Sequence, residues 1–184
     1  RMSYERLATW YEERTLAGER LYLSCFDERI RTRTHGPLAE EERCQMGRRQ
    51  FSIAPSGRLY PCIQFVREDD DPTYALGDVL QGFDSDRRRA VSGCADGEKA
   101  ECGGCALRAR CSSWCACINF LSTGRIDQAS PVLCEHERLL MPIADGVANR
   151  LWKQRDPLFL HKHYNPAFPV LEYAERLTLR EVSR

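Results

Sequence analysis

The ten cysteines of this 184-residue chain are the residues whose type and spacing most clearly predict chemistry. Cys102 and Cys105 form a C-x2-C pair, a turn that lets two thiolates converge on one metal centre. Further cysteines follow at short intervals and stand far upstream and downstream of this pair. They are Cys25, Cys44, Cys62, Cys94, Cys111, Cys115, Cys117 and Cys134. On spacing alone, iron–sulfur clusters, structural zinc and disulfides all remain open.

Composition and the chain's beginning favour metal chemistry over disulfides. The opening Arg-Met-Ser-Tyr-Glu-Arg lacks the basic region and apolar stretch of a secretory signal, which predicts a cytoplasmic protein. Lysine and arginine together number 27, as do aspartate and glutamate, so no nucleic acid or anionic membrane is expected as a partner. No apolar run approaches the roughly 20 residues that cross a bilayer.

Seven cysteines and one glycine follow a longer pattern. They read Cys44-x12-Gly57-x4-Cys62, then Cys102-x2-Cys105-x5-Cys111-x3-Cys115, then Cys134. This pattern resembles the SPASM domain, which follows the catalytic barrel of radical S-adenosylmethionine (radical SAM) enzymes that modify peptides and proteins. The resemblance covers residues 44–134 and includes the phrases at 52–62 and 76–79. Residues 1–43 resemble the closing segment of a partial βα barrel, which makes the chain the C-terminal part of a larger enzyme.

The resemblance implies two auxiliary 4Fe-4S clusters with interleaved ligands. The first would bind Cys44, Cys62 and Cys115, and the second would bind Cys102, Cys105, Cys111 and Cys134. Sulfatase maturases complete the first cluster with a cysteine at the position that Leu38 occupies here. The first cluster is therefore expected either to keep an open iron, the favoured alternative, or to recruit a further thiol. The candidates are Cys25, Cys94 and Cys117, although an apolar strand would make Cys25 a buried core thiol.

The function implied is electron transfer and substrate positioning in an oxidoreductase that matures peptides. The radical SAM motif C-x3-C-x2-C is absent, because Ile118 stands where its third cysteine would follow Cys111 and Cys115. S-adenosylmethionine and a third 4Fe-4S cluster would thus bind the upstream barrel, the chain alone should be inactive, and its catalytic residues are unidentified. Ile63 replaces an aspartate of sulfatase maturases, so maturation of ribosomal peptides (RiPPs) is favoured. The expected partners are the barrel, a peptide or protein substrate and an external electron donor or acceptor.

Two functions from other classes stay open. One is a structural zinc-binding interaction module, since soft thiolates suit zinc as well as iron–sulfur clusters. The other is a stand-alone ferredoxin-like electron carrier. The metal and sulfide content of the purified protein distinguishes the zinc module from the proposed domain. The coding sequence upstream distinguishes the stand-alone electron carrier from it.

Patterning predicts an α+β fold in three segments: residues 1–43, a SPASM domain at 44–134, and a helical segment at 135–184. We expect a helix over 1–20, a buried strand over 21–26, a hairpin that turns at Gly57, and a short helix over 85–91. Residues 92–134 are poor in apolar side chains and should be loops stapled by the clusters. A helix follows Cys134, and another should start near Asn165. His161 and His163 are expected to be solvated or to cap a helix.

Overall fold

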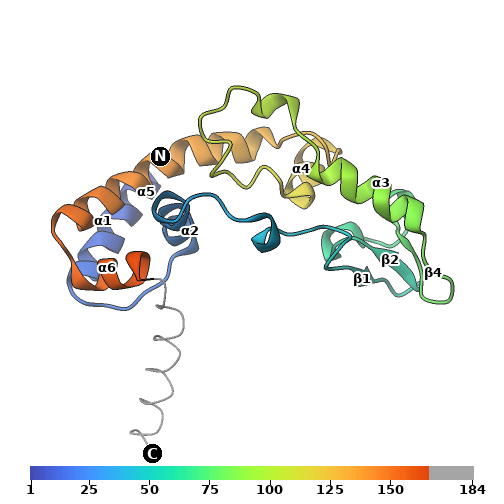
Figure 1. The fold of residues 1–184 in the computed structure, drawn as a ribbon, viewed down its shortest axis with the longest axis horizontal. Helices are drawn as coiled ribbons and strands as arrows, with labels where there is room; N and C mark the ends of the chain where they lie inside the picture. The colour runs from blue at the N-terminus through green and yellow to red at the C-terminus, as the bar shows by residue number, and fades with distance from the viewer. Residues whose placement is uncertain (166–184) are drawn as a thin grey trace, which may run out of the picture. The chain divides into compact units, whose positions relative to one another are not determined.

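The computed structural model describes residues 1–165, which form two compact units. We call residues 1–37 together with those from 138 onward the helical unit, and residues 38–137 the cysteine unit. The fold is α+β, with helices in both units and one small antiparallel sheet (Figure 1). The helix predicted to start near Asn165 lies beyond the described residues. Within residues 1–165, no helix has both the length and the apolar character needed to cross a membrane.

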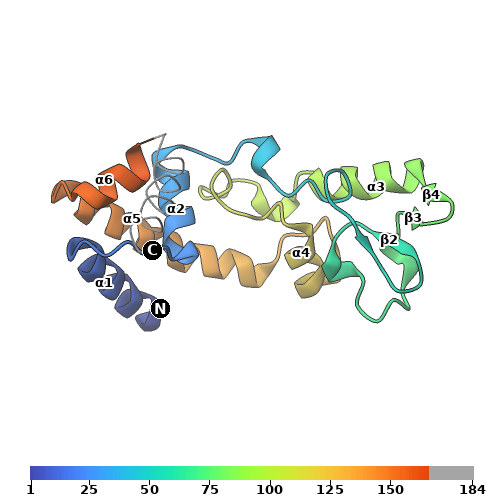
Figure 2. The same cartoon turned by 90° about the horizontal axis from the view of Figure 1, so that it is seen from below.

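The helical unit is built by α1 (Met2–Leu16), α2 (Ser24–Thr34), most of α5 (Pro131–Lys153), and α6 (Pro157–Tyr164). On α5, Leu140, Ala144, Val147 and Leu151 recur every three or four residues and are fully buried. This spacing is typical of the buried face of a helix, as the sequence predicted. Figure 2 shows α1, α2 and α6 gathered around this part of α5. The remaining members of the core are Ala8, Tyr11, Phe26, Ile30, Ala148 and Phe159.

The strand predicted over residues 21–26 is wrong, because α2 begins at Ser24. The N–H of Leu23 donates to Oδ2 of Asp27 at 2.6 Å, which closes the first turn of the helix. Phe26 and Ile30, four residues apart, lie on the face of this helix that packs into the core. A short apolar run does not by itself distinguish a strand from a buried helix. The first helix also ends earlier than expected, at Leu16.

The cysteine unit contains a sheet in the order β1-β2-β3-β4. The strands are β1 (Ser52–Ile53), β2 (Arg58–Tyr60), β3 (Gly77–Asp78) and β4 (Gly82–Phe83). The predicted hairpin is confirmed: Ile53 pairs with Leu59, and Gly57 turns the chain with φ of +89°. Its return strand stops at Tyr60, and a 3₁₀ helix, η2 (Ile63–Phe65), follows.

Gly77 is a second position that requires glycine. Its φ is +145°, and a Cβ there would lie 2.1 Å from the carbonyl oxygen of Gly82 on the neighbouring strand. Any side chain would therefore separate β3 from β4, which approach each other closely only because this residue lacks one.

Residues 92–134 are more ordered than the loops that the sequence predicted. The short helix expected over 85–91 is α3, which Asp84 caps and which continues to Asp96. The stretch also includes α4 (Ala116–Thr123) and the start of α5 at Pro131. Residues 92–134 also make apolar contacts, because Ala95, Ala116 and Ile126 belong to the core of the cysteine unit. The remaining members of that core are Met46, Ala54, Tyr60, Phe65, Ala75 and Cys117.

Candidate metal centres

Four thiols form what we call the first thiol group: Cys44, Cys62, Cys115 and Cys117. Cys44 interacts electrostatically with Cys62 and Cys115, and Cys117 is hydrogen-bonded to both Cys62 and Cys115. The four residues come from three segments of the chain: the one before the sheet, the one after β2, and the start of α4. All four pack against the apolar core of the cysteine unit.

Aromatic rings fix the segments that present this group. Phe65, three residues after Cys62, lies with its ring centre 4.9 Å from that of Phe120 on α4, the helix that follows Cys115. Tyr74 completes the cluster at 5.0 Å from each of these rings. Ring pairs at this distance are favourable. The cluster therefore holds the end of the hairpin against the helix that carries Cys117.

Burial and hydrogen bonding shift the acidity of these thiols. The hydrogen bond from Cys117 stabilises the Cys115 thiolate and lowers the pKa of Cys115, and backbone N–H groups at the first turn of α4 add to this effect. The same hydrogen bond, together with burial, raises the pKa of Cys117. Burial is also the main cause of the raised pKa of Cys44, although Nε2 of Gln50 donates to its sulfur at 2.7 Å. Together, the two opposite shifts of Cys115 and Cys117 favour a single thiolate within this pair of thiols.

Three other thiols, Cys102, Cys111 and Cys134, form what we call the second thiol group. Cys111 interacts electrostatically with the other two and with the carboxylate of Glu137, which is 2% exposed. Burial raises the pKa of Cys111 to about 11, and these neighbours contribute in the same direction. A metal centre would favour the deprotonated form, because thiolates rather than thiols are ligands.

Asn119, Glu101 and Ser130 connect the segments of the second group. Asn119 is fully buried; its Nδ2 donates to the carbonyl of Ser113 at 2.9 Å, and its Oδ1 accepts the N–H of Ser130 at 3.0 Å. The side chain of Glu101 accepts the N–H of Ala129 at 3.3 Å. The turns that hold Cys102 and Cys111 are thus tied to the first turn of α5, which presents Cys134.

The other three cysteines are placed differently. Cys105 follows Cys102 in a turn closed by a 3.2 Å hydrogen bond from its N–H to the Cys102 carbonyl. Cys25 packs against the core of the helical unit, on α2 rather than on the predicted strand, and burial raises its pKa. Cys94 is exposed on α3, where it interacts electrostatically with Tyr74 and Arg125. Of the three extra ligands considered from the sequence, Cys117 alone is shown beside Cys62 and Cys115.

The donor atoms suit a thiolate-ligated centre. All ten cysteines are free thiols in the described chain. Within residues 1–165, no three histidine, cysteine, aspartate or glutamate side chains lie close enough together to hold a single metal ion. In a 4Fe-4S cluster each thiolate binds a different iron, so its sulfurs surround the cluster rather than one ion. Four thiols in the first group, and three in the second with Cys105 three residues after Cys102, match the number and type of ligands that two such clusters need.

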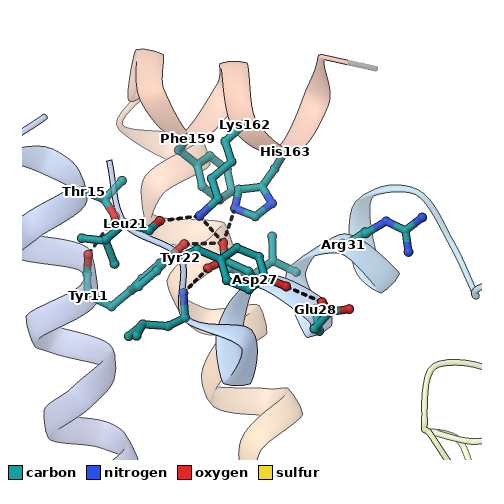
Figure 3. A network of polar contacts seen from close by, with 12 residues as sticks. Tyr11, Thr15, Leu21, Tyr22, Asp27, Glu28, Arg31, Phe159, Lys162 and His163 are labelled. Carbon is teal, nitrogen blue, oxygen red and sulfur yellow. Dashed lines mark hydrogen bonds and ion pairs between the residues drawn. The ribbon is translucent and has the colours of Figure 1, made fainter. Parts of the chain in front are cut away.

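The helical unit contains a different constellation, centred on Asp27 (Figure 3). Its carboxylate, 3% exposed, accepts the hydroxyl of Tyr11 at 2.8 Å and lies 2.5 Å from Nζ of Lys162. Nε2 of His163 lies 3.2 Å from the same carboxylate, although it is not aligned for a hydrogen bond. The expectation that His163 is solvated or caps a helix is therefore wrong, since it is 4% exposed.

The groups around Asp27 set its charge. Burial alone would raise the pKa of Asp27, but His163, the ammonium of Lys162 and the N–H of Leu23 together lower it below its usual value. Burial lowers the pKa of His163, which favours the neutral ring. Burial and the Asp27 carboxylate raise the pKa of Tyr11, so its hydroxyl stays protonated and donates. The network joins α1, α2 and α6 through one buried carboxylate.

Sequence reasoning missed Asn119, Glu101 and the Asp27 network. Ser130 followed by Pro131 was a readable signal for the start of α5, because Pro is favoured at the first helical position. A buried asparagine inside a helix has no comparable signature. Asp27 and Lys162 are 135 positions apart, and nothing in the local pattern pairs them.

No protein-family model matches this chain, and no curated protein matches it at a significant level of similarity. A functional assignment therefore depends on the cysteine spacing and on how the fold groups the thiols.

Proposed function

We propose that this chain is the auxiliary iron–sulfur part of a radical SAM enzyme of the SPASM type, which modifies a peptide, and that it binds two 4Fe-4S clusters. Cys44, Cys62 and Cys115 would hold the first cluster, and the second would be held by Cys102, Cys105, Cys111 and Cys134. Residues 1–43 would close an upstream barrel, to which they contribute α1 and α2. The enzyme would act in the cytoplasm on a ribosomal peptide.

One observation supports this proposal above the others. Cys111 and Cys115 are four positions apart, yet Cys115 lies with Cys44 and Cys62, whereas Cys111 lies with Cys102 and Cys134. Adjacent cysteines of a simple zinc ribbon are expected to share one site. Two interleaved groups are what a pair of clusters with ligands in the proposed order requires.

The chain's own residues would hold the thiols and exclude water. When bound, a cluster of this kind supplies a one-electron donor or acceptor whose potential depends on ligation, hydrogen bonds and burial. Gln50 donates a hydrogen bond to the Cys44 sulfur, and Asn119 holds the backbone next to the second group. Neither group offers a residue that the structure assigns to the chemistry of the substrate.

Anaerobic reconstitution of the full chain with iron and sulfide tests the proposal. We expect a brown protein with about eight iron and eight sulfide per chain, bleached by dithionite, because two 4Fe-4S clusters require that content. Cys102→Ala should lose one cluster and keep the other, and the matched control Cys94→Ala should keep both. A colourless chain that binds stoichiometric zinc and no sulfide would show that the zinc module is correct, since thiolates suit zinc too.

A further inference from the structure

The sequence left the fourth ligand of the first cluster open and favoured an iron without a protein ligand. We infer instead that Cys117 is that fourth ligand, so that Cys44, Cys62, Cys115 and Cys117 together enclose the first cluster. This inference rests on the proposed function. It adds a metal-binding residue outside the spacing pattern and removes a vacant coordination position from the first cluster.

The contacts of Cys117 are the first argument. Cys62 and Cys115, two of the thiols proposed for this cluster, lie close enough to Cys117 to influence its pKa. Cys117 is 7% exposed and belongs to the core against which Cys44, Cys62 and Cys115 pack. A fourth ligand has to come from the residues that pack around the other three, and Cys117 is one of them.

Local backbone geometry is the second argument. Two ligands in a C-x-C segment would point to opposite sides of an extended chain. Here Cys115 is the N-cap of α4, with extended φ and ψ of −72° and 94°, and Cys117 is the second residue of the helix. The chain therefore changes from extended to helical between them, so the two side chains are not forced to opposite sides of the segment. The positive end of the α4 dipole also favours negative charge at this position.

The competing cysteines are less suitable. Cys94 is exposed on α3 and interacts with Tyr74 and Arg125. Cys25 packs against the core of the helical unit, whereas the first thiol group belongs to the cysteine unit.

Substitution of Cys117, followed by metal analysis and electron paramagnetic resonance (EPR), tests this inference without any measurement of enzyme activity. In the reconstituted wild-type chain, added cyanide should leave the spectrum of the reduced first cluster unchanged, since every iron already has a protein ligand. In Cys117→Ala, either iron should fall from about eight toward about four per chain, or an altered first-cluster signal should shift when cyanide is added. Cys117→Ser, which keeps a donor atom and nearly the same volume, should retain the iron with an altered spectrum.

The controls separate the possible failures. Cys94→Ala should match the wild type in iron, spectrum and response to cyanide. An intact second-cluster signal in Cys117→Ala shows that the variant has folded. If Cys117→Ala keeps eight irons with an unchanged, cyanide-insensitive spectrum, Cys117 is a packed core thiol and this inference is wrong, while the proposed function stands. If the wild-type chain binds no iron and sulfide, the proposed function fails as well.

Discussion

The two units of this molecule are stabilised by different kinds of side chain. Among the largest fully buried side chains in the described residues, the helical unit contributes apolar or aromatic groups such as Tyr11, Phe26 and Leu151. The cysteine unit contributes Tyr60 and Leu76, but also Asn119 and Glu137. One unit has a conventional core with a single polar hub, and the other has a small core interrupted by polar groups and thiols.

This difference indicates where a bound metal would matter. A core that removes large apolar side chains from water is stable by itself, whereas a small domain with little apolar surface depends on cross-links or metal sites. The helical unit should therefore fold without metal. The cysteine unit should depend on its two thiol groups, with hydrogen bonds such as those of Asn119 in a secondary role.

Metal removal should produce the largest contrast between the units. Structural zinc contributes about 10 kcal/mol or more to the folding of small domains, and we expect a cluster to contribute on a similar scale. Hydrogen exchange of the chain, before and after the iron is chelated, should show loss of protection across residues 38–137 and little change in α1, α2 and α6. Equal loss of protection in both units would show that the helical unit depends on the metal as much as the cysteine unit does.

Asp27→Asn should destabilise the helical unit alone. The change leaves the ammonium of Lys162 and the hydroxyl of Tyr11 without the buried carboxylate, and removal of one partner from a buried ion pair costs about 3–5 kcal/mol. Urea unfolding followed by exchange in α2 measures the effect. Asp145→Asn is the matched control in the same unit, because its pair with Arg33 is partly exposed and should contribute less than about 1 kcal/mol.

Asn119→Ala should destabilise the cysteine unit by about 2–3 kcal/mol, because the carbonyl of Ser113 and the N–H of Ser130 lose their buried partner. In the reconstituted chain, the second cluster should be lost before the first when iron is chelated. Asn149→Ala, which removes an exposed hydrogen bond from Arg33, serves as the control. Simultaneous loss of both clusters would show that Asn119 does not act on the second thiol group in particular.

Acid should weaken the helical unit in two stages. The pKa of His163 is lowered in the folded state from an ordinary value near 6.5, so the unfolded chain takes up a proton first as the pH falls below that value. The pKa of Asp27 is lowered from about 3.8, so a second loss follows below that pH. Each step lowers the free energy of unfolding by at most about 1.4 kcal/mol per pH unit. His163→Asn should remove the first stage, and unfolding measured from pH 7 to pH 3 checks this.

The sequence by itself determined the local features of the fold. Gly57 marked the hairpin because a turn residue with positive φ favours glycine. The helical spacing of Leu140, Val147 and Leu151 marked the buried face of α5. The spacing of seven cysteines also supported the family resemblance, which implied two interleaved ligand sets. Each of these signals lies within a short stretch of chain or in a pattern of spacing.

Tertiary structure decided the features that depend on distant residues. It made residues 24–34 a helix, whose apolar face packs in a core shared with α5. It brought Cys117 beside Cys62, and Lys162 and His163 to Asp27. A buried polar group or thiol needs a partner inside the protein, because water cannot reach it. Which residue becomes that partner depends on how the whole unit packs. Local sequence specifies most of the elements, whereas packing decides the ambiguous ones and selects which distant side chains meet.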